Sequence, residues 1–235
     1  MTRRHFHRQA LGLGLITTLA WHRAWALSLQ DLSAGELNQA LAGTLEQGVQ
    51  AAVKLLGQPG GFLDNPKVRI PLPKPLEKAG KMLTMAGKGK QVDELVTSMN
   101  RAAEAAVPMG QKALVSAIKG MTVSDARAIL GGGDNAVTQF FSEKPRAPLT
   151  EAFLPVVTQT TEKVGTVQAY NKVAGKAAQL GLVQADQASV QQYVTGKTLD
   201  GLYSVIGEQE KQLRQDPAKA GTDLLKKVFG AVKAG

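Results

Sequence analysis

The 235-residue chain contains no cysteine, and its three histidines, His5, His7 and His22, all lie within the first 26 residues. The absence of cysteine excludes disulfides, thiolate metal sites, a cysteine nucleophile and a lipid-carrying cysteine. If the first 26 residues are removed, as argued below, the rest of the chain lacks histidine as well. That excludes Ser-His-Asp triads and the usual zinc and copper sites, so any chemistry must depend on carboxylates, amides, hydroxyls and cations.

The N-terminus has the pattern of a cleavable export signal. Arg3 and Arg4 are followed by an apolar run at residues 10–20 and by Ala24-Trp25-Ala26, the small-x-small pattern of a signal-peptidase site. The apolar run is shorter than the roughly 20 residues that a membrane-spanning helix needs. We therefore expect residues 1–26 to be cleaved, leaving a soluble periplasmic chain with no transmembrane anchor. Twin-arginine and general secretory export both remain open.

The positive charge is concentrated in one segment. The whole chain carries 28 Lys+Arg and 19 Asp+Glu, a net charge of +9, and removing the four arginines of the predicted signal leaves +5. Residues 67–90 hold a single acid, Glu77, and seven cations, which we call the basic surface: Lys67, Arg69, Lys74, Lys78, Lys81, Lys88 and Lys90.

We expect the basic surface to bind an anionic component of the cell envelope, such as lipid headgroups or lipopolysaccharide phosphates, or an acidic periplasmic protein. A solvated charged surface without a partner is the alternative. The segment contains no aromatic residue on which bases could stack, and export also argues against nucleic acid as a partner.

Apolar residues recur at helical spacing through residues 27–235, and no alternating strand pattern of useful length appears. This predicts one all-α domain, an irregular multi-helix bundle of about eight or nine helices. Ser33-x-x-Glu36 is a capping box before the first long helix, and Thr122 with Asp125 is expected to cap a later one.

Four prolines punctuate residues 62–76, which we call the strap. Because proline lacks a backbone donor and restricts the residue before it, we expect the strap to be non-helical, with at most a very short strand from Lys67 to Ile70. A short helix with Met82 and Leu83 in its apolar stripe should follow. Further helices are expected from Thr150 to Val164 and over residues 190–214, and Asp216-Pro217 should begin a terminal helix.

Several stretches resemble a known family when they are considered together: Gly61 to Pro73, Met99 to Glu104, Met121 to Leu130, Gly132-Gly133-Asp134, Tyr170-Asn171, Asp200-Gly201-Leu202 and Arg214 to Pro217. The chain resembles the exported proteobacterial family catalogued as domain of unknown function four-one-nine-seven. The resemblance implies a periplasmic, single-domain helical protein and supplies no activity, cofactor or catalytic residue.

Carboxylates are the remaining candidates for catalysis, and Glu104, Asp125, Asp134 and Asp200 are the ones considered. Asn100, Arg101 and Glu104 lie within about one helical turn, and Asp125 and Arg127 could join them across helices as a polar cluster. A structural network of caps and ion pairs is the favoured alternative to a catalytic site. No cofactor is expected, although carboxylate-bound Ca²⁺ or Mg²⁺ stays open.

The sequence favours a non-enzymatic binding or interaction protein of the cell envelope, which would bind an envelope partner or an apolar ligand between its helices, with the basic surface steering association. A carboxylate-dependent hydrolase is the second hypothesis, with Glu104, Asp125 or Asp134 as the candidate catalytic group. A structural subunit that pairs with itself through an exposed apolar stripe is the third. The sequence leaves the oligomeric state open.

Overall fold

The computed structural model describes residues 33–133, 136–163, 165–179 and 188–216, and these ranges are all-α without a strand. The prediction of an all-α multi-helix fold is confirmed. Asp134 and the expected terminal helix after Asp216 lie outside the described residues. The elements are α1 (Ala34–Leu56), α2 (Lys74–Leu83), η2 (Thr84–Lys88), α3 (Gly89–Ala106), η3 (Val107–Gly110), α4 (Gln111–Lys119), α5 (Val123–Gly131), α6 (Ala136–Glu143), α7 (Arg146–Thr161), α8 (Gly165–Gln179) and α9 (Val190–Gln215).

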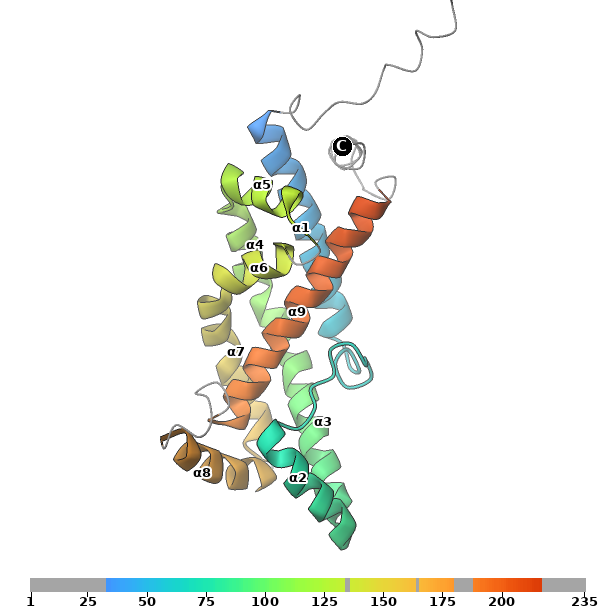
Figure 1. Cartoon of the computed structure of the whole chain (residues 1–235), viewed down its shortest axis with the longest axis vertical. Coiled ribbons are helices and arrows are strands. Elements are labelled where there is room, and N and C mark those ends of the chain that lie inside the picture. Colours follow the sequence, from blue (N-terminus) through green and yellow to red (C-terminus); the bar gives the residue numbers. More distant parts are fainter. Residues whose placement is uncertain (1–32, 134–135, 164, 180–187, 217–235) are drawn as a thin grey trace, which may run out of the picture.

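Two long helices, α1 and α9, pack against each other and organise the bundle (Figure 1). The predicted capping box begins α1, where the Ser33 side chain accepts from the Glu36 amide and the Glu36 carboxylate accepts from the Ser33 amide. Apolar residues of α1 at helical spacing, from Leu37 to Leu56, are buried in the common core. Helices α6 and α7 also pack on α9, so α9 is the central support of the fold.

The strap is non-helical, as predicted, but only as far as Pro73. Its last three residues begin α2, because Pro75 lies in the first helical turn, where a missing backbone donor costs nothing. The stretch from Lys67 to Ile70 forms no strand.

Helices α2 and α3 form a hairpin that projects from one end of the molecule (Figure 1). The turn between them, η2, contains Gly87 with φ 76°, a left-handed conformation that suits glycine. No residue of η2 is buried, and the buried residues of α3 begin only at Leu95. The outer half of the hairpin therefore stands away from the core, and its inner half is part of it.

Helix α7 differs from its predicted range of Thr150 to Val164, because it runs from Arg146 to Thr161. Thr150 does not cap the helix, since its hydroxyl donates to the Arg146 carbonyl within the first turn at 2.8 Å. Pro155 consequently lies in the helix interior rather than in an early turn. It is exposed, and burial of Phe153 and Val157 on the other side of the helix stabilises α7 despite the lost hydrogen bond.

Within the described residues, the helices are too short or too polar for any of them to span a lipid bilayer.

Candidate binding surface and the groove beside the strap

Glu104 of α3 holds the turn that leads from α1 into the strap. One carboxylate oxygen, Oε1, accepts hydrogen bonds from the backbone amides of Gly60, Phe62 and Leu63, each at 3.1 Å. The other oxygen accepts from the Arg101 guanidinium at 2.6 Å. The side chain of Glu104 is almost fully buried, and both of its oxygens are occupied. This carboxylate therefore organises backbone rather than facing a substrate.

Asn100, one helical turn before Glu104, holds the strap itself. Its Oδ1 accepts from the Ile70 amide at 2.8 Å, and its Nδ2 donates to the Ile70 carbonyl at 3.0 Å and to the Val96 carbonyl at 2.8 Å. Asn100 is fully buried. The side-chain amide thus gives Ile70 the pair of hydrogen bonds that a neighbouring strand would give, which explains why the strap needs no strand partner here.

The other two members of the expected polar cluster lie elsewhere. Asp125 completes a capping box with Thr122 on α5 and also accepts a hydrogen bond from Lys144 at 2.7 Å. The Lys144 hydrogen bond and the Thr122 amide lower the pKa of Asp125 to about 2. Arg127 is exposed and makes no ion pair with any described residue. The group on α3 therefore consists of Asn100, Arg101 and Glu104 alone.

The remaining candidate carboxylates do not form a site either. Asp134 lies outside the described residues, and Asp200 accepts from Arg146 at 3.1 Å and lies 3.8 Å from Lys197. In the described ranges, no three or more His, Cys, Asp or Glu side chains come together in a way that could hold a metal ion. The carboxylates of Glu104, Asp125 and Asp200 are instead bonded to backbone amides or to cations, as structural caps and ion pairs are.

The basic surface is divided by the structure. Lys67 pairs with Glu208 of α9 at 2.9 Å. The other six cations are exposed and make no ion pair within the described part of the chain: Arg69 on the strap, Lys74, Lys78 and Lys81 on α2, Lys88 on η2 and Lys90 on α3. The unpaired cations therefore belong to the projecting hairpin and to the strap beside it.

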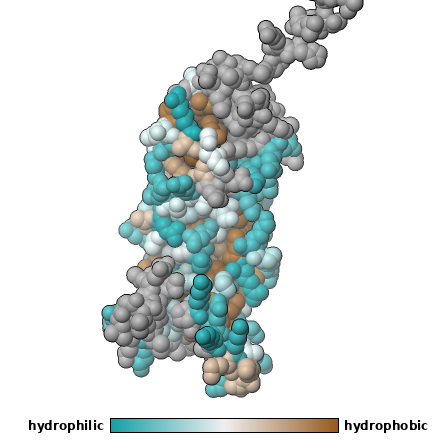
Figure 2. Space-filling view, viewed as in Figure 1, coloured by the Kyte–Doolittle hydropathy of each residue, from teal (hydrophilic) through white to brown (hydrophobic). Residues whose placement is uncertain are grey.

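Two methionines at the outer part of the hairpin are strongly exposed, Met82 at 70% and Met85 at 83%. The end of the hairpin is accordingly mildly hydrophobic among hydrophilic neighbours in Figure 2. The sequence pattern wrongly assigned Met82 to an inward stripe, because a helix of this length shows too few turns to distinguish its buried side. The exposure of these methionines among lysines is the surface feature that sequence reasoning missed.

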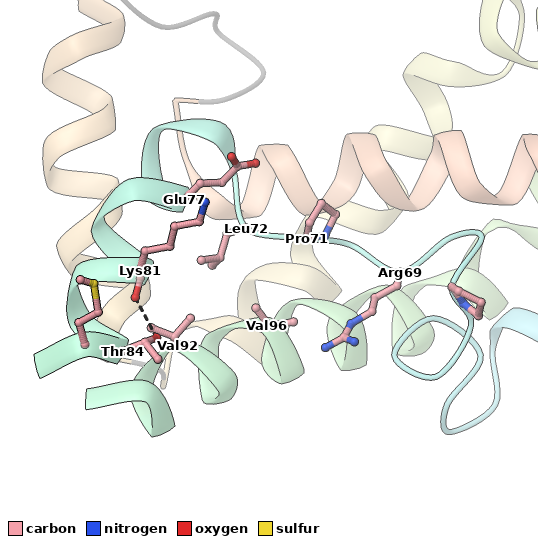
Figure 3. Close-up of a pocket in the computed structure, with 11 residues that line it drawn as sticks. Arg69, Pro71, Leu72, Glu77, Lys81, Thr84, Val92 and Val96 are labelled. Carbon is pink, nitrogen blue, oxygen red and sulfur yellow. Dashed lines mark hydrogen bonds between the residues drawn. The ribbon is translucent and has the colours of Figure 1, made fainter. Parts of the chain in front are cut away.

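A groove of about 880 Å³ lies between the strap, α2 and α3 (Figure 3). Its lining is mainly apolar, including Pro71, Leu72, Val92 and Val96, and Figure 2 shows hydrophobic surface between hydrophilic borders on this side of the molecule. Arg69 lies at one end, and Lys81 and Thr84 lie toward the other (Figure 3). The sequence gives one indirect signal for the groove, Gly80 in the middle of α2, where a Cβ atom would come within 2.7 Å of Leu72 Cδ1.

Comparison with known proteins identifies a family and no characterised relative. No curated protein and no solved structure matches the chain. The family model described as "Protein of unknown function (DUF4197)" matches residues 31–230, which include every described residue from Ser33 to Asp216. The match covers the α1 capping box, the strap, the hairpin and α9 alike, and on that basis the chain belongs to the DUF4197 family.

Proposed function

We propose that this protein is a non-enzymatic binding protein of the bacterial periplasm and that it docks on anionic lipid surfaces of the cell envelope through the α2–α3 hairpin. The observation that carries the proposal is the set of six exposed cations without an ion pair in the described chain, on the hairpin and the strap beside it, together with the exposed Met82 and Met85 near the turn of the hairpin. Lysine and arginine near an anionic bilayer each contribute about 1 kcal/mol of attraction. Exposed methionine adds flexible apolar surface that adapts to irregular contacts.

The location of the hairpin supports docking. It projects from the end of the bundle, and its outer half contributes nothing to the buried core between Thr84 and Glu94. Contact at this end would therefore leave the packing of α1, α7 and α9 undisturbed. An acidic protein partner would use the same cations, and the lipid is preferred because the methionines lie among them.

The occupied carboxylates favour binding over hydrolysis. A general acid or base must lie within hydrogen-bond reach of the proton that it transfers. Glu104 is buried and accepts from the Gly60, Phe62 and Leu63 amides, and Asp125 accepts from Thr122 and Lys144. Neither carboxylate lines the groove between the strap, α2 and α3.

The periplasmic location rests on the leader pattern of residues 1–26. It is tested by expressing the full chain in a Gram-negative host and measuring the mass of the protein released from the periplasm. A product that begins at Leu27 supports export and cleavage. A full-length product that stays in the cytoplasm would remove the envelope from the proposal.

Docking is tested by flotation of the processed protein with vesicles of phosphatidylcholine, with or without phosphatidylglycerol. We expect binding only to the anionic vesicles, and weaker binding as salt is raised. Changing Lys74, Lys78 and Lys81 together to Gln should weaken binding roughly 100-fold, on the basis of about 1 kcal/mol for each cation.

The matched control removes the same charge from exposed lysines elsewhere, Lys54, Lys112 and Lys119, and should bind nearly as well as the unaltered protein. Equal losses in both triple variants would mean that net charge alone attracts the protein, and the hairpin assignment would then be wrong. Absence of vesicle binding in the unaltered protein would favour an acidic protein partner instead.

A further inference from the structure

We propose that the groove between the strap, α2 and α3 binds a single-chain anionic amphiphile, an alkyl chain with a phosphate or carboxylate headgroup, and that Arg69 binds the headgroup. This goes beyond docking on a lipid surface, because it concerns one molecule held in a groove rather than the charge of the hairpin. The two proposals share Arg69, Lys81 and Met85 and otherwise use different residues.

The groove has the size and lining of a ligand site. Its volume of about 880 Å³ lies within the range of roughly 300–1,000 Å³ that is usual for small-molecule sites. The apolar lining comes from three separate elements, with Leu72 from the strap, Met85 from η2 and Val92 and Val96 from α3. Binding an alkyl chain would remove these half-buried and exposed side chains from water.

The strap wall of the groove is held in place before any ligand arrives. Asn100 fixes Ile70 through two hydrogen bonds, and Ile70 is buried while its neighbours Arg69 and Pro71 are exposed and line the groove. The Tyr193 hydroxyl of α9 donates to the Pro71 carbonyl at 3.2 Å. A wall fixed at the two residues that follow Arg69 reduces the ordering cost of binding.

The distribution of charge sets the orientation of the ligand. Arg69 lies at one end of the groove, and Val96 and Val92 lead from it toward Thr84 (Figure 3). The only acid in the lining, Glu77, lies beside Lys81 and away from Arg69 (Figure 3). A guanidinium presents paired donors that match a phosphate or a carboxylate. The headgroup therefore belongs at Arg69 and the alkyl chain along Val96, Leu72 and Val92.

The chemistry of the strap favours an alkyl chain over an extended peptide. A peptide in such a groove would gain affinity by adding a strand, which needs free backbone donors and acceptors. Pro66, Pro71 and Pro73 have no backbone donor, and both backbone groups of Ile70 are already bonded to Asn100. An alkyl chain requires no hydrogen-bond partner, so it loses nothing in contact with this wall.

The test measures binding of dodecyl phosphate and of dodecanoate to the full chain by calorimetry, below the concentration at which either forms micelles, with inorganic phosphate as the headgroup alone. We expect saturable binding of one amphiphile and none of inorganic phosphate. Preference for dodecyl phosphate would indicate a phospholipid-like source of the ligand, and preference for dodecanoate a fatty acid.

Three substitutions locate the site. Val92→Phe fills the groove and should abolish binding, and Arg69→Gln should weaken it about tenfold or more through loss of a charge-assisted hydrogen bond. Lys112→Gln removes the same charge from an exposed residue outside the groove and the basic surface, and should leave binding unchanged. Equal weakening by Arg69→Gln and Lys112→Gln would overturn the headgroup assignment.

A second measurement does not depend on whether a variant folds. With ¹³C-methyl methionine labels, the amphiphile should shift the Met85 resonance and leave Met109, which is 55% exposed on η3, unmoved. No saturable binding, or a shift at Met109 in place of Met85, would overturn the groove proposal. Vesicle flotation distinguishes the two functions, because vesicle binding without amphiphile binding refutes only the groove, and the reverse result refutes only docking.

Discussion

Asn100 and Ile70, thirty residues apart, are joined by a reciprocal pair of hydrogen bonds of 2.8 and 3.0 Å between a side-chain amide and the two backbone groups of one residue. Asn100 is buried in the inner half of the hairpin, and Ile70 is buried at the centre of the strap. The pair ties the strap to α3 at the position where the strap forms one wall of the groove. Stability of the strap and shape of the groove are therefore linked through one side chain.

The first prediction concerns this pair. Asn100→Leu keeps a similar shape and removes every bond to Ile70 and Val96, so buried backbone groups are left without partners. We expect a loss of about 1–3 kcal/mol in the free energy of unfolding, measured with urea. Hydrogen exchange at the Ile70 amide should accelerate well beyond the global change. Asn100→Asp, which can still accept from Ile70 and cannot donate, should retain part of the amide protection.

Glu104 gives the second prediction. Glu104→Gln keeps the shape and weakens the bonds to the Gly60, Phe62 and Leu63 amides, because a carboxylate accepts more strongly than a neutral amide oxygen. It also leaves Arg101 without its partner. The expected cost is about 1–3 kcal/mol in urea unfolding. Glu94→Gln on the exposed side of the same helix is the control and should change stability little. Equal effects of the two substitutions would contradict the structural role assigned to Glu104.

The third prediction is a pH dependence. The pKa of Asp125 is lowered from 3.8 to about 2, chiefly by the Lys144 hydrogen bond and the Thr122 amide. A lowered folded-state pKa stabilises the protein above the unfolded-state value and loses that contribution as pH falls through the folded-state value.

Asp125→Asn should therefore cost about 1 kcal/mol at pH 6, less than the full shift implies because Lys144 is half exposed. The difference between the two proteins should shrink as pH falls from about 4 to 2, which thermal unfolding at a series of pH values would measure. A difference that stays constant down to pH 2 would show that the carboxylate charge does not matter. Asp93→Asn on exposed α3 surface is the matched control.

The turn of the hairpin gives the fourth prediction. Gly87 has φ 76°, and an L side chain there would be strained by about 1–2 kcal/mol, so Gly87→Ala should lower the melting temperature. Gly89→Ala, two residues later in helical conformation, makes only an ordinary contact with Thr84 at 3.5 Å and should be neutral or stabilising. Equal effects of both changes in calorimetry would refute the left-handed turn.

Local rules predicted much of the fold. Both helix starts at Ser33 and Thr122 depend on residues three apart in sequence, and both appear as capping boxes. Apolar periodicity predicted a helix over residues 190–214, and α9 ends one residue later, at Gln215. The start of α7 was wrong because Thr150 has two local uses, as a cap or as a donor to the carbonyl four residues earlier, and packing selected the second.

The site depended on contacts that sequence spacing cannot supply. Asn100, Arg101 and Glu104 were recognised as a polar group on one helix. Their partners, the amides of Gly60, Phe62 and Leu63 and the backbone of Ile70, are 30 to 44 residues away. Asp125 and Arg127 were expected to join them, and the long-range arrangement of α5 placed them elsewhere. The groove arises only where three elements meet, so neither its size nor its lining follows from any one segment.

The anchoring of the hairpin has a mechanical consequence. Asn100 and Glu104, which lie one helical turn apart, attach the inner half of α3 to the strap and to the turn before it. The outer part of the hairpin, from Thr84 to Glu94, has no buried residue. The hairpin is thus a cantilever with a fixed base and a free end. A load applied at Gly87 therefore acts on a base that is held in two ways, by the packing of α3 on α7 and α9 and by the hydrogen bonds to Ile70 and to the Gly60, Phe62 and Leu63 amides.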